Sequence, residues 1–196
     1  MWYYETESGC DRMEPIRCCW ADPASELYIA YHDQEWGVPE HNDQKLFEML
    51  ILEGFQAGLS WITILKKRDA FRRAFDGFDP AVVAGYSPEK QDSLMNDPGI
   101  VRNRRKIEAA VTNASAFLEI QKEFGSFDRY LWAFTDGQVI LNTDNEVRAS
   151  SDLSDRISAD LKRRGMKFVG SVIIYSFLQA VGVVNDHETG CWRYPR

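Results

Sequence analysis

Apolar side chains recur at intervals of three and four residues along most of the chain, which is the spacing of an amphipathic helix. Tyr28, Tyr31 and His32 follow the same spacing and would lie on one side of a helical turn. One segment, residues 172–181, is apolar on nearly every side and is therefore predicted to be a central helix. The pattern predicts a mainly α-helical protein. The other segments with clear helical spacing are residues 45–52, 61–75 and 107–121.

Polar caps, glycine and proline mark the expected helix ends. Asn42 or Asp43 can cap the helix that contains residues 45–52. A cap followed by proline occurs at residues 79–80 and again at 87–88, so two short helices should begin there. Gly125 is placed to end the long helix after residue 121.

The length of 196 residues is that of one domain. Residues 1–16 are polar and lack apolar periodicity, so we interpret them as a loosely held N-terminal extension, and residues 17–196 as a single domain. Residues 135–151 have the least regular pattern, with one short extended piece expected at 139–141. No apolar run reaches the ~18 residues of a membrane span. The first residues also lack the features of a secretory signal, so we expect a cytoplasmic monomer without a membrane partner.

The cysteines and histidines suggest a metal site. His187 and Cys191 form an H-x3-C pair, a spacing at which one turn can present two zinc ligands. His32 together with Cys18 or Cys19 could supply the other pair. Because thiols stay reduced in the cytoplasm, ligands or free thiols are expected rather than disulfides. The alternative is a set of unrelated thiols and ordinary histidines.

A four-ligand site would have structural consequences. It would join residues 17–37 to residues 184–193 and contribute directly to folding. Since no coordination position would be left open for water, the metal would be structural rather than catalytic, which argues against a zinc hydrolase.

The segment that starts at Glu53 combines several unusual features. Glu53 follows an apolar run directly, and a buried carboxylate without a partner is costly or changes its pKa. Gly54 and Gly58 are expected to bracket a turn, and Ser60 can cap the helix that begins at Trp61. These residues fit either a helical corner with Glu53 in a surface salt bridge or a binding site that uses the carboxylate.

Charge alone leaves the partner open. The formal net charge of −7 argues against nucleic acid, but phosphate binding requires only a local basic face. Basic residues cluster at 66–73, 102–106 and 162–167. Solvated helix faces often look the same, so these clusters do not decide the question.

Longer blocks give the chain a recognisable pattern. They are R-C-x-W at 17–20, YIAYHD at 28–33, EWGVP at 35–39, KLFE at 45–48, LEG at 52–54, QAGLSWIT at 56–63, KFVG at 167–170, YSF at 175–177 and VNDH at 184–187. With these blocks, residues from Arg17 to about Cys191 resemble the bacterial type I DNA-3-methyladenine glycosylases, a divergent branch of the helix-hairpin-helix glycosylases. The first sixteen residues have no counterpart in that pattern.

The resemblance implies a helix-hairpin-helix glycosylase-like fold and a set of site residues. One structural zinc per chain would be held by Cys18, His32, His187 and Cys191. Glu53 and Tyr31 would be the catalytic, hydrogen-bonding groups of a base pocket. Its other substrate-binding residues would be Trp61, as a stacking face, with Trp20, Tyr28, Trp36 and Ser176 around it. The hairpin would span residues 97–106. The DNA-binding residues would be Gly99, Arg102, Arg104 and Lys106 in the hairpin, and Gln56, Gly58 and Leu59 in the segment that enters the gap left by an extruded nucleotide.

The implied activity is base excision. Such an enzyme flips 3-methyladenine out of alkylated double-stranded DNA and hydrolyses its N-glycosidic bond. No lysine stands out as a Schiff-base nucleophile, so we expect a monofunctional glycosylase without lyase activity. The main rival is a zinc-stabilised protein that binds methylated bases without excising them.

Overall fold

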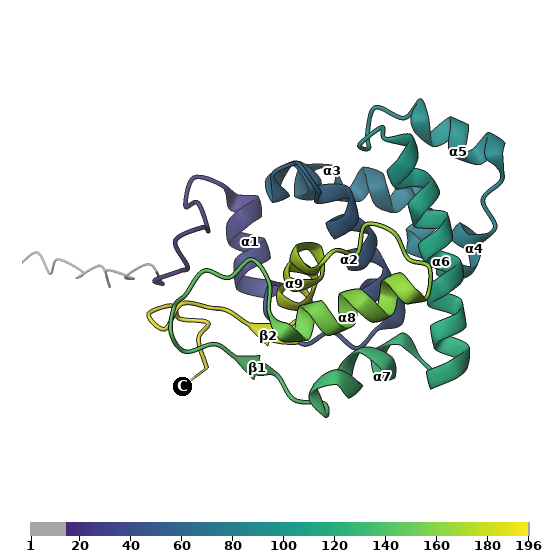
Figure 1. Cartoon of the computed structure of the whole chain (residues 1–196). Coiled ribbons are helices and arrows are strands. Elements are labelled where there is room, and N and C mark those ends of the chain that lie inside the picture. The colour runs from purple at the N-terminus through teal and green to yellow at the C-terminus, as the bar shows by residue number, and fades with distance from the viewer. Residues whose placement is uncertain (1–14, 196) are drawn as a thin grey trace, which may run out of the picture.

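The computed structural model describes residues 15–195, and helices dominate it (Figure 1). Residues 1–14 of the predicted extension, with Cys10, lie outside the described part. The helices are α1 (Glu26–Gln34), α2 (Asp43–Gln56), α3 (Trp61–Ala74), α4 (Pro80–Ala84), α5 (Pro88–Met95), α6 (Arg104–Phe124), α7 (Phe127–Trp132), α8 (Asp152–Arg163) and α9 (Ser171–Ala180). Two short 3-10 turns, η1 (Asp76–Phe78) and η2 (Ala133–Thr135), and two short strands, β1 (Ile140–Leu141) and β2 (Val184–Asn185), complete the list.

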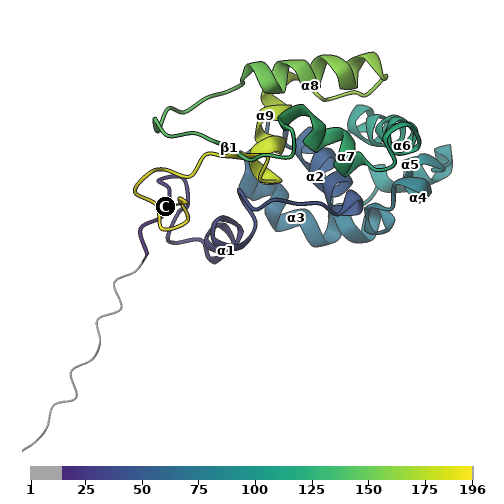
Figure 2. The same ribbon diagram turned by 90° about the horizontal axis from the view of Figure 1, so that it is seen from below.

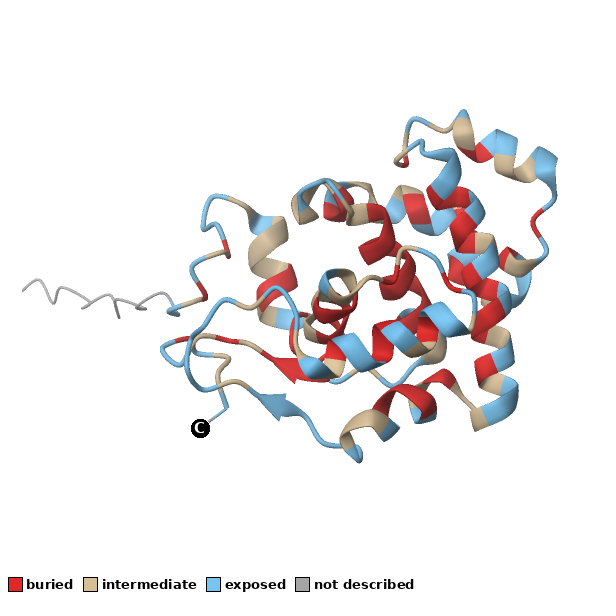
Figure 3. Ribbon diagram, in the orientation of Figure 1, coloured by how far each residue is buried: buried red, intermediate tan, exposed pale blue. Residues whose placement is uncertain are grey.

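Helix α2 lies at the centre of the molecule and is buried without interruption from Leu46 to Phe55. It packs against α3, α6, α7 and α9 and so contributes to the packing of all four (Figures 1 and 3). Helix α9 is central as predicted, although not on every side, because Val172 is 57% exposed. The centre of the fold therefore consists of α2, which is buried from Leu46 to Phe55 and carries Glu53, and α9, which is partly exposed to solvent.

The helix boundaries follow the predicted caps. The side chain of Asn42 accepts a hydrogen bond from the backbone N–H of Lys45 and begins α2. Asp43, the alternative cap, instead accepts hydrogen bonds from the backbone N–H groups of Phe127 and Asp128 at the start of α7. Gly125 ends α6 in the left-handed region, with φ of 86°. Local polar groups therefore both end the helices and connect them.

The turn after α2 differs from the prediction. Glu53 and Gly54 lie inside α2, which continues to Gln56, so Gly54 is helical and brackets no turn. Gly58 alone has the expected turn conformation, with φ of 81°. Ser60 precedes α3 as predicted, but its hydroxyl bonds to the hydroxyl of Thr63 rather than to a backbone N–H. The longer helix buries Glu53 more deeply than the sequence indicated.

The two ends of the described chain meet beside α1 (Figure 2). Strand β1 falls within the extended piece predicted at 139–141 and pairs in parallel with β2. The backbone N–H of Trp192 then donates to the carbonyl of Ile16 at 2.9 Å. This arrangement places the C-terminal residues against the segment that leads into α1. No helix in residues 15–195 is both long and apolar enough to cross a bilayer.

Candidate functional site

A cavity of about 300 Å³ opens between the segment before α1, helices α1, α2 and α3, and α9. Its lining contains every residue predicted for the base pocket, together with two others. The lining residues are Trp20, Tyr28, Tyr31, Trp36, Glu53, Gln56, Trp61, Ser176 and Gln179. Five of these nine side chains are tryptophan or tyrosine, so the walls are flat and largely apolar, as suits a planar aromatic ligand.

The aromatic walls support one another. The rings of Trp20 and Trp36 lie edge to face with centroids 5.0 Å apart, and those of Tyr31 and Trp61 are 5.5 Å apart. The hydroxyl of Tyr28 accepts a hydrogen bond from the backbone N–H of Ile62 at 3.1 Å, which fixes α1 to the start of α3. The indole N–H groups of Trp20 and Trp61 are buried and have no hydrogen-bond partner within residues 15–195. The walls of the cavity are therefore rings that pack against one another.

Glu53 is a strongly perturbed acidic group in the cavity. It is 4% exposed, and burial raises the pKa of its carboxyl from 4.5 to about 8. No residue in the described part of the chain donates a hydrogen bond to this carboxyl, and none forms an ion pair with it. The surface salt bridge considered from the sequence is therefore wrong. A buried carboxyl without a partner, lining a cavity, is a strong indication of a binding site.

Tyr31 lies near Glu53 and is also buried. Burial, followed by the negative charges of Glu53 and Glu35, raises the pKa of its phenol well above the usual value. The phenol therefore keeps its proton and can donate a hydrogen bond to a ligand. Glu35 in turn receives two hydrogen bonds from the guanidinium of Arg68 on α3, which fixes the end of α1 to α3.

Gln179 is a cavity residue that sequence reasoning missed. Its amide Nε2 donates to the carboxylate of Asp186 at 2.5 Å, and that carboxylate also receives the hydroxyl of Tyr175 at 2.7 Å. Gln179 follows Ser176 by three residues on a helix, so the two share a face. That spacing was the signal in the sequence that could have identified it.

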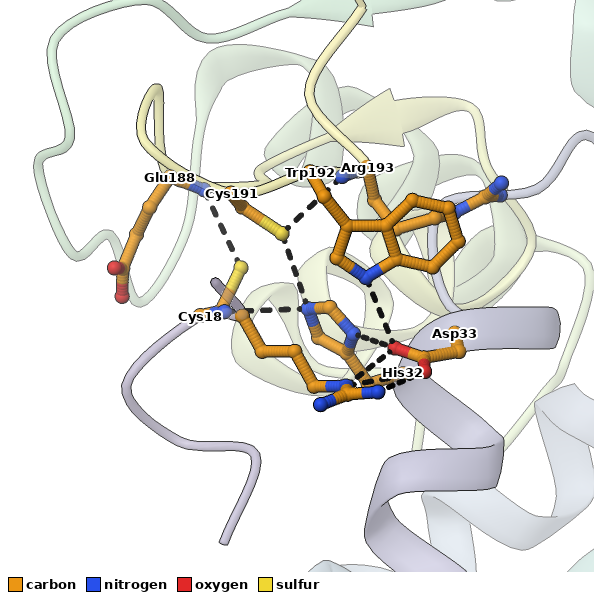
Figure 4. A network of polar contacts seen from close by, with 8 residues as sticks. Cys18, His32, Asp33, Glu188, Cys191, Trp192 and Arg193 are labelled. Atoms are coloured by element: carbon orange, nitrogen blue, oxygen red, sulfur yellow. Dashed lines mark hydrogen bonds and ion pairs between the residues drawn. The ribbon is translucent and has the colours of Figure 1, made fainter. Parts of the chain in front are cut away.

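A second cluster lies where the chain ends meet, next to α1 (Figure 4). The possible ligand atoms of Cys18, His32 and Cys191 all lie within 4.8 Å of one another, and all three side chains are buried. Cys19 is exposed and its backbone N–H bonds to Glu188, so the structure favours Cys18 over Cys19 as the ligand.

His32 is oriented as a metal ligand would be. Its Nδ1 lies 2.7 Å from the carboxylate of Asp33, while its Nε2 lies 3.4 Å from the sulfur of Cys191. Asp33 is also held by two nitrogens of Arg17 and by the indole of Trp192. A carboxylate on Nδ1 makes the other nitrogen, Nε2, the acceptor, as is common beside metals. Here Nε2 accepts a hydrogen bond from the backbone N–H of Cys18 at 3.3 Å.

His187 does not belong to that three-residue group of ligand atoms, but its surroundings fit a fourth ligand. Its Nδ1 bonds to the amide oxygen of Asn185 at 3.0 Å, so Nδ1 carries the proton and Nε2 is an acceptor. This Nε2 is buried and, within residues 15–195, unpartnered. Its ring centroid is 5.1 Å from that of His32. A Cβ on Gly37, whose φ is 73°, would lie 2.8 Å from the His187 ring, so only glycine leaves room there.

The turn between α2 and α3 presents residues predicted to meet DNA. The amide of Gln56 donates to the carbonyl of Leu59 at 2.6 Å, and the backbone N–H of Leu59 donates back to the carbonyl of Gln56 at 2.7 Å. Gly58 supplies the left-handed residue between them. Leu59 is 39% exposed, an apolar side chain at the tip of a turn beside the cavity.

The predicted hairpin connects α5 to α6. The backbone N–H of Gly99 donates to the carboxylate of Asp97 at 2.7 Å, and a Cβ on Gly99 would lie 2.9 Å from that of Ala70. Arg102 is exposed, and Arg104 pairs with Asp92 on α5 at 2.6 Å. The hairpin therefore packs closely on α3 and leaves its arginines at the surface.

Lys106 is placed differently from the prediction. It is 7% exposed, and its Nζ donates to the carbonyls of Phe55 and Ala57 at 2.8 and 2.7 Å. Its ammonium is therefore engaged inside the protein rather than offered to a phosphate.

In two of the three basic clusters, side chains form ion pairs or hydrogen bonds with other parts of the protein. In the first, Arg72 pairs with Glu48 at 2.8 Å, and Lys67 donates to a hairpin carbonyl at 2.9 Å. In the third, Arg164 bonds to both Asp160 and Glu123. Basic clusters in the sequence therefore include side chains that are engaged within the protein.

An aromatic cavity with a buried, unpaired carboxyl suits a flat ligand such as a base. The relatives show the class of protein: a DNA glycosylase, which cleaves the N-glycosyl bond of a base. The family follows from comparison, because residues 20–194 match the model of the methyladenine glycosylase family. The chain belongs to this family.

The relatives agree with this assignment. The chain is 50% identical over 184 residues to DNA-3-methyladenine glycosylase 1 of Escherichia coli, covering 91% of this chain and 97% of the relative. A crystal structure of 3-methyladenine DNA glycosylase I matches with a TM-score of 0.88 and 48% identity, over 92% of this chain and all of the other. A variant of 3-methyladenine DNA glycosylase I, crystallised with 3-methyladenine, matches with a TM-score of 0.85 and 38% identity, over 88% of this chain and 94% of the other.

Proposed function

We propose that this chain excises 3-methyladenine from alkylated double-stranded DNA by hydrolysing the N-glycosidic bond, as a monofunctional enzyme. The observation that carries the proposal is the carboxyl of Glu53, buried and unpaired in an aromatic cavity. Because burial raises its pKa to about 8, the carboxyl keeps its proton near neutral pH in an empty cavity, and a cation that enters favours the ionised form. A base methylated at N3 carries such a charge, whereas ordinary adenine does not.

The base would be held between a flat face and two polar groups. Trp61 offers the stacking face, and cation–π attraction favours a charged base by about 0.5–2 kcal/mol. Glu53 accepts hydrogen bonds from donors on the base, and Tyr31 donates one. A base edge that offered acceptors to Glu53 would leave the carboxylate unpaired, which gives selectivity. Methylation already weakens the glycosidic bond, so the departing base needs little help from a general acid.

Access to the base would come from the turn and the hairpin. Extruding a nucleotide costs a few kcal/mol, and damage lowers that cost. Gln56, Gly58 and Leu59 form a compact turn beside the cavity, suited to fill the gap in the duplex. Gly99, Arg102 and Arg104 belong to the hairpin that would bind the DNA backbone. Lys106, which belongs to the same hairpin, instead donates hydrogen bonds to the carbonyls of Phe55 and Ala57 within the protein.

The lining of the cavity supports the proposal that the enzyme lacks lyase activity. Among the described residues around it there is no lysine. Strand cleavage by a bifunctional glycosylase needs an amine that attacks the sugar, and the ammonium of Lys106 is hydrogen-bonded to two carbonyls away from the cavity.

We also propose one structural zinc ion per chain, bound by Cys18, His32, His187 and Cys191. The three-residue cluster and the unpartnered Nε2 of His187 support this set. Four protein ligands close the coordination shell, so the ion would stabilise the junction of the chain ends and take no part in base excision. Reduced thiols of this kind suit a cytoplasmic monomer.

The direct test is incubation with methylated duplex DNA, followed by chromatography of the released bases. Free 3-methyladenine, with intact strands until alkali is added, is the expected result. Retention of the damaged DNA without release of base would refute excision and favour a damage-binding protein instead. Strand cleavage without alkali would refute the monofunctional assignment.

A further inference from the structure

The carbonyl groups at the C-terminal end of α2 are satisfied by a residue from another helix. The last carbonyls of a helix lack partners within it, and the helix dipole places negative potential there. The Nζ of Lys106, in the first turn of α6, donates to the carbonyls of Phe55 and Ala57 at 2.8 and 2.7 Å. Within residues 15–195, Lys106 is the one side chain from another element that hydrogen-bonds to the backbone of residues 55–59.

The turn that receives this ammonium carries Gln56, Gly58 and Leu59. Apart from Lys106, its hydrogen bonds join Gln56 to Leu59 and so lie within the turn itself. These bonds set the shape of the turn, whose position also depends on α2 and α3 at its two ends. Lys106 adds an attachment to α6, and it does so from the last residue of the hairpin.

Lys106 is held firmly on both sides. Its backbone N–H donates to the side chain of Asn103, the N-cap of α6. The ring of Phe168, from the connection between α8 and α9, lies 5.8 Å from its Nζ and covers it. That connection is anchored by Asn113 of α6, whose amide bonds to both the backbone N–H and the carbonyl of Lys167. The ammonium is therefore packed as well as bonded.

The position of Phe168 is unusual. Its φ is 53°, a conformation that a bulky residue rarely adopts. A Cβ on Gly54 would lie 3.5 Å from that of Phe168, so the ring packs closely against α2 as well. The end of α2, the start of α6 and the connection between α8 and α9 therefore meet at Lys106.

We propose that Lys106 is a positioning residue that couples the hairpin to the turn. When the hairpin binds the DNA backbone, Lys106 fixes where the turn of residues 56–59 stands relative to the duplex. Lys106 is therefore required to extrude the base but not to recognise it. The inference rests on the proposed function, because it assigns the turn the task of entering the duplex.

The test compares two substrates with one enzyme. Lys106→Met removes the donors and keeps the length of the side chain, and release of 3-methyladenine is measured under single-turnover conditions from a duplex and from the same strand alone. We expect release from the duplex to fall about tenfold or more and release from the single strand to fall less than about twofold. Lys122→Met is the matched control, since Lys122 lies on the same helix, is exposed, and pairs only with Glu119.

The ratio of the duplex rate to the single-strand rate distinguishes a role in extrusion from a loss of protein stability. Partial unfolding lowers both rates by the same factor, so only a role in extrusion changes their ratio. Lys106→Arg keeps a charged donor and should restore most of the duplex rate. Equal losses on the two substrates, or an unchanged duplex rate, would overturn the proposal.

Hydrogen exchange separates this inference from the proposed function. Amides of residues 56–60 should exchange faster in Lys106→Met than in Lys122→Met, whether or not the protein releases a base. If the unsubstituted protein released no base from either substrate, the proposed function would be refuted. The exchange measurement would still decide whether Lys106 holds the turn, because unchanged exchange there would refute it.

Discussion

Glu53→Gln is expected to make the protein more stable at neutral pH while making it a poorer enzyme. The carboxyl has a pKa of about 8 in the folded protein and about 4.5 when exposed. The folded state therefore binds its proton more tightly than the unfolded state does. For a group whose pKa is raised on folding, this stability is fully present below the unfolded value and is lost as the pH rises through the folded one. Glutamine stays neutral and escapes that loss.

The size of the effect follows from the two pKa values. Burying an ionisable Glu53 costs about 3 kcal/mol at pH 7 and about 1 kcal/mol at pH 5, relative to a side chain that is always neutral. Any packing difference between Glu and Gln is the same at both pH values. The informative quantity is therefore the change in the stability difference, about 2 kcal/mol between pH 5 and pH 7.

Urea unfolding of both proteins at the two pH values measures this directly. Comparing them at each pH cancels the titration of every other group, His187 included. In parallel, Glu53→Gln should release 3-methyladenine at least about tenfold more slowly, a barrier increase of about 1.4 kcal/mol. A stability difference that did not change with pH would refute the buried, unpaired state of the carboxyl. Unchanged base release would refute its role toward the base.

Three further outcomes are expected. Trp61→Ala should slow base release about tenfold through lost stacking, with a smaller effect on the binding of undamaged DNA, measured by single-turnover release and by titration. Cys18→Ala or His187→Ala should remove the zinc found by metal analysis and lower the melting temperature far more than Cys19→Ala does; a fully zinc-loaded double variant would contradict the site. Arg102→Ala should weaken binding to damaged and undamaged duplex equally and reduce its salt dependence; altered base preference with an unchanged salt slope would argue against a backbone contact.

The helices could be predicted because their signals are local. Caps such as Asn42 and terminators such as Gly125 act within one turn of the chain, and apolar spacing reports the buried face of each helix. The extended piece at 139–141 was identified for the same reason. Its pairing with residues 184–185 was not predicted, because that pairing depends on tertiary structure.

The errors in the site prediction have one physical source. A glycine or a lysine has several uses, and the choice among them depends on distant residues. Gly54 was interpreted as a turn residue, but it lies inside α2, next to Phe168 from the connection between α8 and α9. Lys106 stands in a basic cluster, yet its ammonium completes the end of α2. Gln179 was missed because its spacing from Ser176 was not used and because its carboxylate partner, Asp186, lies beyond the end of α9.

The cavity and the Cys/His cluster share structural elements. Tyr31 and His32 are consecutive residues of α1, and one lines the cavity while the other belongs to the Cys/His cluster. Trp36 joins them again, since it lines the cavity and its ring centroid lies 4.6 Å from that of His187. A metal held at the chain ends would thus fix one wall of the cavity. Glu53 lies on the buried part of α2, where its ionised form is unfavourable without a cation. A fixed wall beside this carboxyl suits selection of a cationic base, because such a base can pair with the ionised carboxylate whereas a neutral base leaves it protonated.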